Sequence, residues 1–509
     1  MSDNTADSTA GADSLIARGA LATASGFLIR FGARLAFLFV AGRLFGPSLY
    51  GAYSLAVAAI EASVGLAGLS LKKTLFQLLD ADDRAEVPVF HRILDAIVLV
   101  ALTSALVAAA IMTATAVLPA TTLAPATAAA LFWIAPMVAG QAIVDILFAA
   151  TRWTHAVRYE VIGRSLVEPY ALLFGTVVAF VAGFHQTGLI LGYWVGNVAV
   201  NIYAVVGLRR CYPGCGLAGY RPTRRLWRMG RALLHNTGSD FLSAISSRVD
   251  LYLVGLLLGE RWAGIYGMAQ QIRTPLRQVR QSFDGLLVPM VARTLAAKGA
   301  AATVVALASA ARLILAIQLP FLILIVAVGA PLLELFGAGF SIGYGALVLL
   351  TIAEAVQGTL GLGDLLFVYL RPRTGFAITL SGFVCAVTAG IMMIPTGGIS
   401  AAAGAMLLAA TLQAALRRVA FGRFLEVLPP IRPLALPLMA GSAGLAMALA
   451  TRSLGGPGGM IATAAGLATY ALILGAATRR HPLAIRGFAT APIGGFAATA
   501  GSGSPPRPV

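Results

Sequence analysis

The chain alternates long apolar runs with short polar segments, a pattern that predicts a bundle of membrane-spanning helices. A helix that crosses a bilayer needs about 20 mostly apolar residues, and the 509-residue chain holds about fourteen stretches of that kind. The polar segments between them are too short to hold a soluble domain. The predicted spans are 20–41, 49–71, 93–117, 128–150, 166–184, 187–207, 237–258, 263–290, 311–334, 343–369, 374–394, 398–416, 433–452 and 458–478.

Composition strengthens this prediction. Hydrophobic residues make up 59% of the chain and charged residues 11%, with a mean hydropathy of +0.86, whereas soluble domains carry about 25% charged residues. A soluble enzyme and a disordered polar protein are both excluded. The net charge of +17 does not indicate nucleic acid, because the basic residues lie in gaps between apolar runs rather than on one solvated face. No nucleic-acid partner is expected.

The basic residues are distributed unequally between the two sides of the predicted bundle. With a cytoplasmic N-terminus, 28 of the 37 arginines and lysines fall in cytoplasmic segments. Only Arg43, Arg261 and Arg452 fall outside, and the remaining six lie within spans. Cytoplasmic loops of membrane proteins are enriched in arginine and lysine. We therefore expect an even number of crossings and both termini in the cytoplasm.

A glycine-rich motif, G-x3-G-x4-G-x-Y-x2-A, occurs twice, each time at the turn from one predicted span into the next. The second copy follows the first at a constant offset of 213 residues. This predicts one tight turn geometry in both halves. The offset covers six helices, an even number, so the halves are parallel repeats related by an axis along the membrane normal. The copies are Gly42, Gly46, Gly51, Tyr53 and Ala56, and Gly255, Gly259, Gly264, Tyr266 and Ala269.

The repeat suggests an all-α integral membrane fold with two parallel six-helix lobes around a central cavity, plus two C-terminal helices. The basic segment at 208–236 contains an amphipathic stretch. We interpret this stretch as a helix that lies on anionic lipid; a regulatory role is the alternative. The expected segments are a cytoplasmic N-terminal tail (1–19), an N-lobe (20–207), the basic cytoplasmic linker (208–236), a C-lobe (237–416), helices 13 and 14 (417–478) and a disordered cytoplasmic tail (479–509).

Six arginines lie inside predicted spans, where one arginine at the helix centre costs about 2.5–3.5 kcal/mol or more. Three of them, at i, i+4 and i+7 in the eighth span, share one helix face. Either the arginines line a wet cationic pocket between the halves, or they form structural ion pairs, Arg248 with Asp250 or Asp240 and Arg280 with Asp284. A phosphate suits such a pocket, because arginine binds phosphate oxygens with a rigid fork. The arginines are Arg30, Arg34, Arg248, Arg273, Arg277 and Arg280.

Seven acidic residues also lie in or near spans. Each could titrate in the path of a coupling ion, or pair with an arginine or cap a helix. No metal or cofactor is expected, because three cysteines make no disulfide framework and no histidine lies near Cys211 and Cys215; the role of that pair stays open. The acids are Glu61, Asp145, Asp240, Asp250, Asp284, Glu354 and Asp364.

Two sequence runs carry a family resemblance. Phe45–Tyr53, after a first helix with arginines, is similar to the start of bacterial polysaccharide and O-antigen flippases, and Asp250–Tyr252 with Gly264–Ala269 resembles their midpoint. These flippases belong to the multidrug/oligosaccharidyl-lipid/polysaccharide exporter superfamily. The resemblance covers about residues 15–480. It implies twelve core helices plus two, and a cationic cavity for a lipid pyrophosphate in which Arg30, Arg34, Arg273 and Arg277 occupy plausible positions.

The leading hypothesis is a flippase, not an enzyme, that moves a lipid-pyrophosphate-linked oligosaccharide across the bacterial inner membrane by alternating access. Its expected partners are that lipid, membrane lipids, and the polysaccharide polymerase and chain-length machinery; a monomer is expected. One alternative is an ion-coupled cation or drug antiporter, which would need acids to dominate the cavity. A membrane glycosyltransferase or polymerase would need larger outer loops, and a structural assembly partner would leave the buried arginines without a role.

Overall fold

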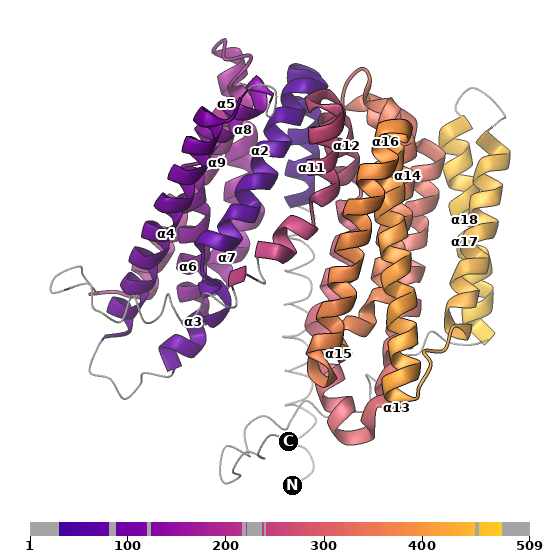
Figure 1. The fold of residues 1–509 in the computed structure, drawn as a ribbon. Coiled ribbons are helices and arrows are strands. Elements are labelled where there is room, and N and C mark those ends of the chain that lie inside the picture. Colours follow the sequence, from indigo (N-terminus) through magenta and orange to yellow (C-terminus); the bar gives the residue numbers. More distant parts are fainter. Residues whose placement is uncertain are drawn as a thin grey trace, which may run out of the picture. The chain divides into compact units, whose positions relative to one another are not determined.

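The computed structural model describes residues 30–80, 88–119, 124–215, 220, 237–238, 241–452 and 458–480. Throughout these residues the regular elements are helices (Figure 1), as expected for an all-α membrane protein. Eight of the described helices are long and apolar enough to cross a membrane, or nine if α5 (Pro125–Ile134) and α6 (Met137–Trp153), bent by 43°, form one span. The count of fourteen stays a prediction.

The chain folds into two compact units. Unit 1 comprises Met1–Ile272, Gly329–Leu350 and Phe383–Met406, and unit 2 comprises Arg273–Val328, Thr351–Gly382 and Leu407–Val509. The predicted division into lobes at 20–207 and 237–416 therefore does not coincide with the compact units, although it remains a hypothesis about the repeat.

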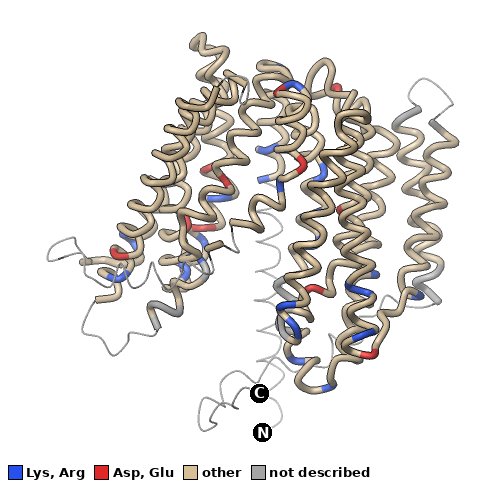
Figure 2. The backbone as a smooth tube through the Cα atoms, in the orientation of Figure 1, with Lys and Arg blue, Asp and Glu red and all other residues tan. Residues whose placement is uncertain are grey.

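In unit 1, α8 packs along α9, and α4 and α9 both pack on α6. Leucine, isoleucine and phenylalanine side chains from these helices, such as Ile93, Leu147 and Phe148, form the core. Figure 2 shows that α4, α8 and α9 carry their charged residues toward one end and are uncharged along the rest, as membrane helices require. Besides α5 and α6, the elements are η1 (Ala41–Phe45), α2 (Gly46–Ala67), α3 (Leu71–Asp80), α4 (Val89–Val117), α7 (Arg158–Ile162), η2 (Gly163–Val167), α8 (Glu168–Val181), α9 (Gly188–Cys211), α11 (Val249–Leu258) and α12 (Glu260–Ile272).

Unit 2 is built around long helices that break at specific residues. Two helices meet at Gly299 within α13, where the φ of 76° lies in the left-handed region that favours glycine. The Tyr470 hydroxyl donates a hydrogen bond to the Ala316 carbonyl at 2.6 Å, which ties α18 to α13. Of the remaining elements, η3 (Phe340–Gly343) belongs to unit 1, and α13 (Thr274–Leu335), α14 (Tyr344–Leu360) and α16 (Pro372–Leu425) each include residues of both units. The elements wholly in unit 2 are η4 (Gly361–Gly363), α15 (Asp364–Leu370), α17 (Arg432–Arg452) and α18 (Gly458–Arg480).

Three predicted spans differ from the helices in their boundaries. The span expected at 166–184 begins at Arg158, and the one expected at 398–416 continues to Leu425. The span expected at 237–258 is interrupted by a turn at residues 247–248, between the helical residues 241–246 and α11 (Val249–Leu258). Apolar content alone places charged residues outside helices, whereas an arginine that is paired with a carboxylate, as Arg417 is in α16, can lie inside one. The predicted break between 394 and 398, by contrast, falls at the kink of α16 at Gly398.

The two copies of the glycine motif have the same backbone geometry and contact each other. Gly46 (φ 71°, ψ 177°) ends one helix and begins α2, and Gly259 (φ 90°, ψ 179°) stands in the same way between α11 and α12. A Cβ atom on Gly51 would lie 1.8 Å from the Glu260 carbonyl oxygen, and one on Gly264 would lie 1.9 Å from that of Pro47. Pro47 and Glu260 occupy the same position in the two copies, as do Gly51 and Gly264. A twofold operation that exchanges the copies therefore exchanges the two contacts.

Candidate functional site: a cationic cavity in unit 1

A cavity of about 170 Å³ lies among the helices of unit 1. Its walls come from the helical residues 30–40 and from α2, η2, α8, α9, α11 and α12, so it unites segments from both halves of the sequence. We call it the cationic cavity. Its charged lining residues are Arg30, Arg34, Glu61, Arg164, Glu168 and Arg248.

Arg34 enters the cavity from the first described helix. Its Nη2 donates a hydrogen bond to the side-chain oxygen of Gln271, on α12. Since the amide is neutral, this contact orients the guanidinium without cancelling its charge. Arg30 lies one turn away on the same face and is exposed. Arg34 also interacts electrostatically with Glu61, Arg248 and Arg30.

Arg248 and Glu61 form an ion pair across the cavity wall. Arg248 Nη2 lies 2.8 Å from Glu61 Oε2. The Glu61 side chain is 54% exposed and lines the cavity, so this carboxylate is only partly covered. The predicted ion pair of Arg248 with Asp250 is not formed: Asp250 accepts hydrogen bonds from the Tyr266 hydroxyl and the Gln270 amide, both at 2.8 Å. The other predicted partner, Asp240, lies outside the described residues.

A second charged group enters from η2, a π-helical turn. Arg164 donates from Nη1 to Glu168 Oε2 at 3.0 Å and from Nη2 to Asp145 Oδ1 at 2.5 Å. Asp145 in turn accepts from Lys72 Nζ at 3.1 Å. The predicted coupling candidate Asp145 is thus held between two cations.

The charges of the described lining residues do not cancel. Four are arginines and two are glutamates. Glu61 is taken up by Arg248, and Glu168 by Arg164. Among the charged lining residues, Arg30 and Arg34 are therefore the positive excess, and an anion is the natural ligand of such a site.

Phenol rings form much of the uncharged wall. Tyr53 lies 6.2 Å from Tyr193 and 6.4 Å from Tyr50, measured between ring centroids. The volume of 170 Å³ is below the about 300–1,000 Å³ of an ordinary small-molecule pocket. The cavity in this conformation therefore admits a small charged group and not an oligosaccharide.

The predicted arginines of the eighth span lie elsewhere. Arg273 and Arg277 belong to unit 2, where Arg273 Nη1 lies 3.1 Å and Arg277 Nε 3.5 Å from Glu354 Oε2. Arg280 is a half-buried residue of α13. None of the three is among the lining residues of the cationic cavity.

None of the remaining predicted acids is among the described residues that line the cationic cavity. Asp364 is bound by Arg417, whose Nε and Nη2 lie 2.6 and 2.7 Å from its two oxygens. This is a bidentate pair in unit 2 rather than a lone carboxylate. Asp240 and the side chain of Asp284 lie outside the described part of the chain.

Sequence reasoning missed Arg164 and Glu168. Arg164 lies before the apolar run that begins at residue 166, which places it in a cytoplasmic segment, and Glu168 lies within that run but is not among the candidate acids. Their spacing of four residues, which allows an ion pair on one helix face, was the signal that could have revealed them.

Comparisons with known proteins agree with this architecture. A structure described as "Lipid II flippase MurJ, inward closed conformation" superposes with a TM-score of 0.72 at 12% sequence identity, over 90% of this chain and 99% of the other. An inward-facing multidrug resistance transporter of the MATE family, in the MOP superfamily, superposes with a TM-score of 0.62 at 11% identity, over 80% and 99%.

At these identities the structural likeness establishes the fold alone. A sequence search among curated proteins finds no match. The sequence pattern of the polysaccharide biosynthesis protein family, however, matches residues 16–295, more than half of the chain and the segment that forms the cationic cavity. The chain is therefore a multi-pass membrane protein that belongs to the polysaccharide biosynthesis protein family.

Proposed function

We propose that this protein is a flippase that moves a lipid-diphosphate-linked oligosaccharide from the cytoplasmic to the outer face of the inner membrane. The observation that carries the proposal is the excess of Arg30 and Arg34 over the paired charges of the cationic cavity. The match to a polysaccharide biosynthesis family and the likeness to a structure named as a lipid II flippase support the substrate class.

The physical task explains why such a cavity is needed. Each unpaired polar group of a sugar or diphosphate that enters hydrocarbon costs several kcal/mol. A hydrated site that offers guanidinium donors replaces the lost water contacts, while the lipid tail stays in the bilayer. Because the cavity is smaller than an oligosaccharide, we infer that it opens to load the sugar and closes around the charged group, as alternating access requires.

An ion-coupled drug or cation antiporter on the same fold is the second candidate, and the MATE likeness is consistent with it. Such a protein needs carboxylates in excess within its cavity. Here each lining carboxylate is engaged by an arginine and two further arginines remain. The charge balance therefore favours the anionic substrate.

The protein acts as a transporter rather than an enzyme in this proposal, with both termini in the cytoplasm and as a monomer beside the polymerase and chain-length machinery. The orientation follows from the arginine and lysine distribution. Fusing a reporter that is active only in the cytoplasm to either terminus gives signal, whereas a reporter inserted after Gly183, in the turn between α8 and α9, gives none.

Reconstituted vesicles with a fluorescent undecaprenyl-diphosphate oligosaccharide test the function directly. We expect the intact protein to expose the lipid to a membrane-impermeant reagent on the far leaflet, and Arg34→Gln to reduce the initial rate by at least about tenfold, since a hydrogen bond to a charged group is worth about 1.5–3 kcal/mol.

Arg261→Gln is the matched control, because Arg261 is an exposed residue of α12, the helix that also bears Gln271, and it does not line the cavity. It should retain full activity. Movement of the lipid at equal rates by Arg34→Gln and the intact protein would refute a role of the cavity, and no movement by the intact protein would refute the flippase.

A further inference from the structure

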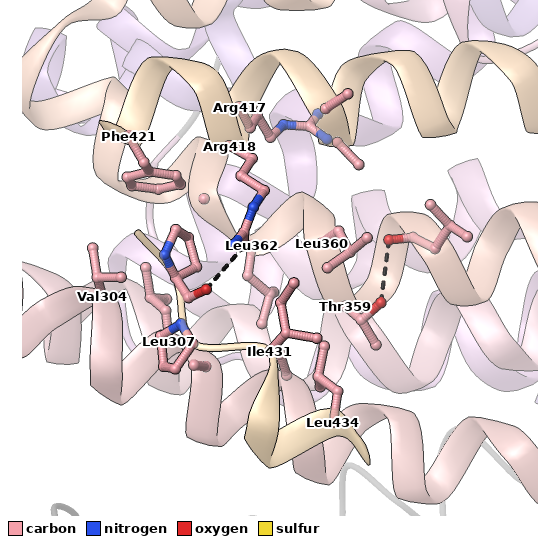
Figure 3. Close-up of a pocket in the computed structure, with 18 of the residues that line it drawn as sticks. Val304, Leu307, Thr359, Leu360, Leu362, Arg417, Arg418, Phe421, Ile431 and Leu434 are labelled. Atoms are coloured by element: carbon pink, nitrogen blue, oxygen red, sulfur yellow. Dashed lines mark hydrogen bonds between the residues drawn. The ribbon is translucent and has the colours of Figure 1, made fainter. Parts of the chain in front are cut away.

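Unit 2 contains a larger cavity that the proposed transport function does not use. Its volume is about 390 Å³, within the range of ligand-binding pockets. It lies between α13, α14, α16 and the segment that leads into α17 (Figure 3). The lining is almost wholly apolar, with Leu307, Leu362, Phe421 and Leu434 among its walls.

The cavity is accessible from the outside of unit 2. Three of its lining side chains are large, apolar and well exposed: Leu360 at 45%, Ile431 at 53% and Leu438 at 48%. Exposed apolar side chains of this size suit contact with the hydrocarbon of lipid better than contact with water. The opening of the cavity is therefore chemically matched to an acyl chain.

Two arginines distinguish this cavity from an ordinary lipid-facing crevice. Figure 3 shows Arg418 extending from α16 toward the segment that carries Ile431, where its Nη1 donates to the Pro429 carbonyl at 3.0 Å. That bond uses one of the five guanidinium N–H groups. Arg417 is 3% exposed and, in the described structure, its Nη1 has no hydrogen-bond acceptor.

The surrounding charge is also positive. Asp364 neutralises Arg417 but not Arg418. Between residues 417 and 432 the sequence contains four arginines, Arg417, Arg418, Arg423 and Arg432, and a single acid, Glu426. An apolar cavity that opens to lipid with a cation at its rim is complementary to an amphipathic anion.

We propose that this cavity binds an anionic glycerophospholipid of the surrounding membrane, with one acyl chain inside it and the phosphate at Arg418. The acyl chain itself provides little discrimination, because lipid tails are as apolar as the cavity wall. Selectivity for the head group therefore depends on Arg418. Since the residues of this site are separate from those of the cationic cavity, the proposal stands or falls independently of transport.

Native mass spectrometry of the purified full-length protein tests the site with dioleoyl phosphatidylglycerol and dioleoyl phosphatidylcholine. We expect phosphatidylglycerol to bind about tenfold more tightly, as one charge-assisted hydrogen bond predicts. Arg418→Gln should remove that preference. Because Arg418 is exposed, this variant keeps the fold, and Arg423→Gln, an exposed arginine of the same helix outside the lining, should keep the preference.

A second pair of variants tests the position of the acyl chain. Ala415→Trp fills the cavity at its rim and should lower binding of both lipids by a similar factor, whereas Val419→Trp, an exposed residue that does not line the cavity, should not. Equal binding of the two lipids, an unchanged preference in Arg418→Gln, or equal effects of the two tryptophans would each overturn the proposal. Tighter binding of a polyprenyl phosphate than of phosphatidylglycerol would also overturn it.

Discussion

At the scale of single residues, the ion pair between Arg248 and Glu61 limits how many donors the cationic cavity offers to an anion. The two side chains are 2.8 Å apart, and about half of the Glu61 side chain is exposed. In the proposed function, a phosphate would therefore compete with a carboxylate that is already in place. We expect Glu61 to lower the affinity of the cavity for anions.

Glu61→Gln should consequently strengthen anion binding. The substitution removes one negative charge and frees a guanidinium donor, so we expect inorganic pyrophosphate to bind about three- to tenfold more tightly at low salt. Isothermal titration of the purified protein measures this. Glu160→Gln is the control, because Glu160 pairs with Arg152 at 3.2 Å and does not line the cavity; weaker or unchanged binding in Glu61→Gln would contradict the cavity's role.

Glu354 differs from Glu61 because it pairs with two arginines of unit 2, Arg273 and Arg277. The side chains of Arg273 and Glu354 are only 6% and 7% exposed. Removing one partner of a buried pair costs about 3–5 kcal/mol, so Glu354→Gln should lower the free energy of unfolding by that amount in mixed-detergent titrations. The double variant Arg273→Met with Glu354→Leu should recover much of the loss. A single variant as stable as the intact protein would show that the pair is not structural.

The residue scale also shows how far sequence reasoning reaches. The sequence located Arg30, Arg34 and Arg248 within spans and required a cavity or partners for them, and all three line one cavity. It could not assign partners, because Glu61 is 187 residues from Arg248 and Glu354 is 81 from Arg273. Pairing across such separations depends on packing, which hydropathy does not encode.

At the scale of elements, the crossing of α2 and α12 depends on two glycines. A methyl group on Gly51 or Gly264 would overlap a carbonyl oxygen of the other helix. Each alanine substitution should therefore separate the helices and destabilise the protein by about 1–3 kcal/mol, the usual range for overpacking. Because the contacts are related by exchange of the two copies, the two losses should be similar.

Thermal unfolding of the two variants in one detergent measures this. Gly475→Ala in α18 is the control, since among the described residues no atom outside its own helix backbone and chain neighbours lies within 4 Å of the added methyl group, and alanine is the better helix former by about 1 kcal/mol. Clearly unequal losses at the two glycines would mean that the motif copies are not equivalent in packing, despite their common turn geometry.

The element scale explains which parts of the fold were predictable. The motif spacing predicted one turn geometry for residues 46 and 259, because a left-handed glycine is a local property. It gave no sign that the copies touch, since these contacts join Gly51 to Glu260 and Pro47 to Gly264, far apart in the sequence. Helix ends next to charged residues were the least predictable, as α16 shows by carrying Arg417 inside the helix.

At the scale of the whole molecule, the proposed substrate carries about two negative charges through the membrane. Each charge gains about 2.3 kcal/mol per 100 mV. A potential of about 100 mV, negative on the loading side, therefore supplies roughly 4.6 kcal/mol for two charges. We expect transport in reconstituted vesicles to accelerate when a potassium diffusion potential of that sign is imposed, and to slow when the sign is reversed. If the transport rate does not change with the potential but changes with a proton or sodium gradient, the driving force comes from a coupled ion.

The π-helical turn Gly163–Val167 has a consequence for how this cavity tolerates change. A π turn holds one residue more than the α-helical turn it replaces, and each residue rotates an α-helix by about 100°. Loss of Ser165 would therefore close the π turn to an α-helical turn and keep α7 and α8 in register, while the side chains within the turn change direction. The direction of Arg164 into the cavity thus depends on the extra residue beside it: a deletion that removes no charged side chain should disturb the site through its backbone.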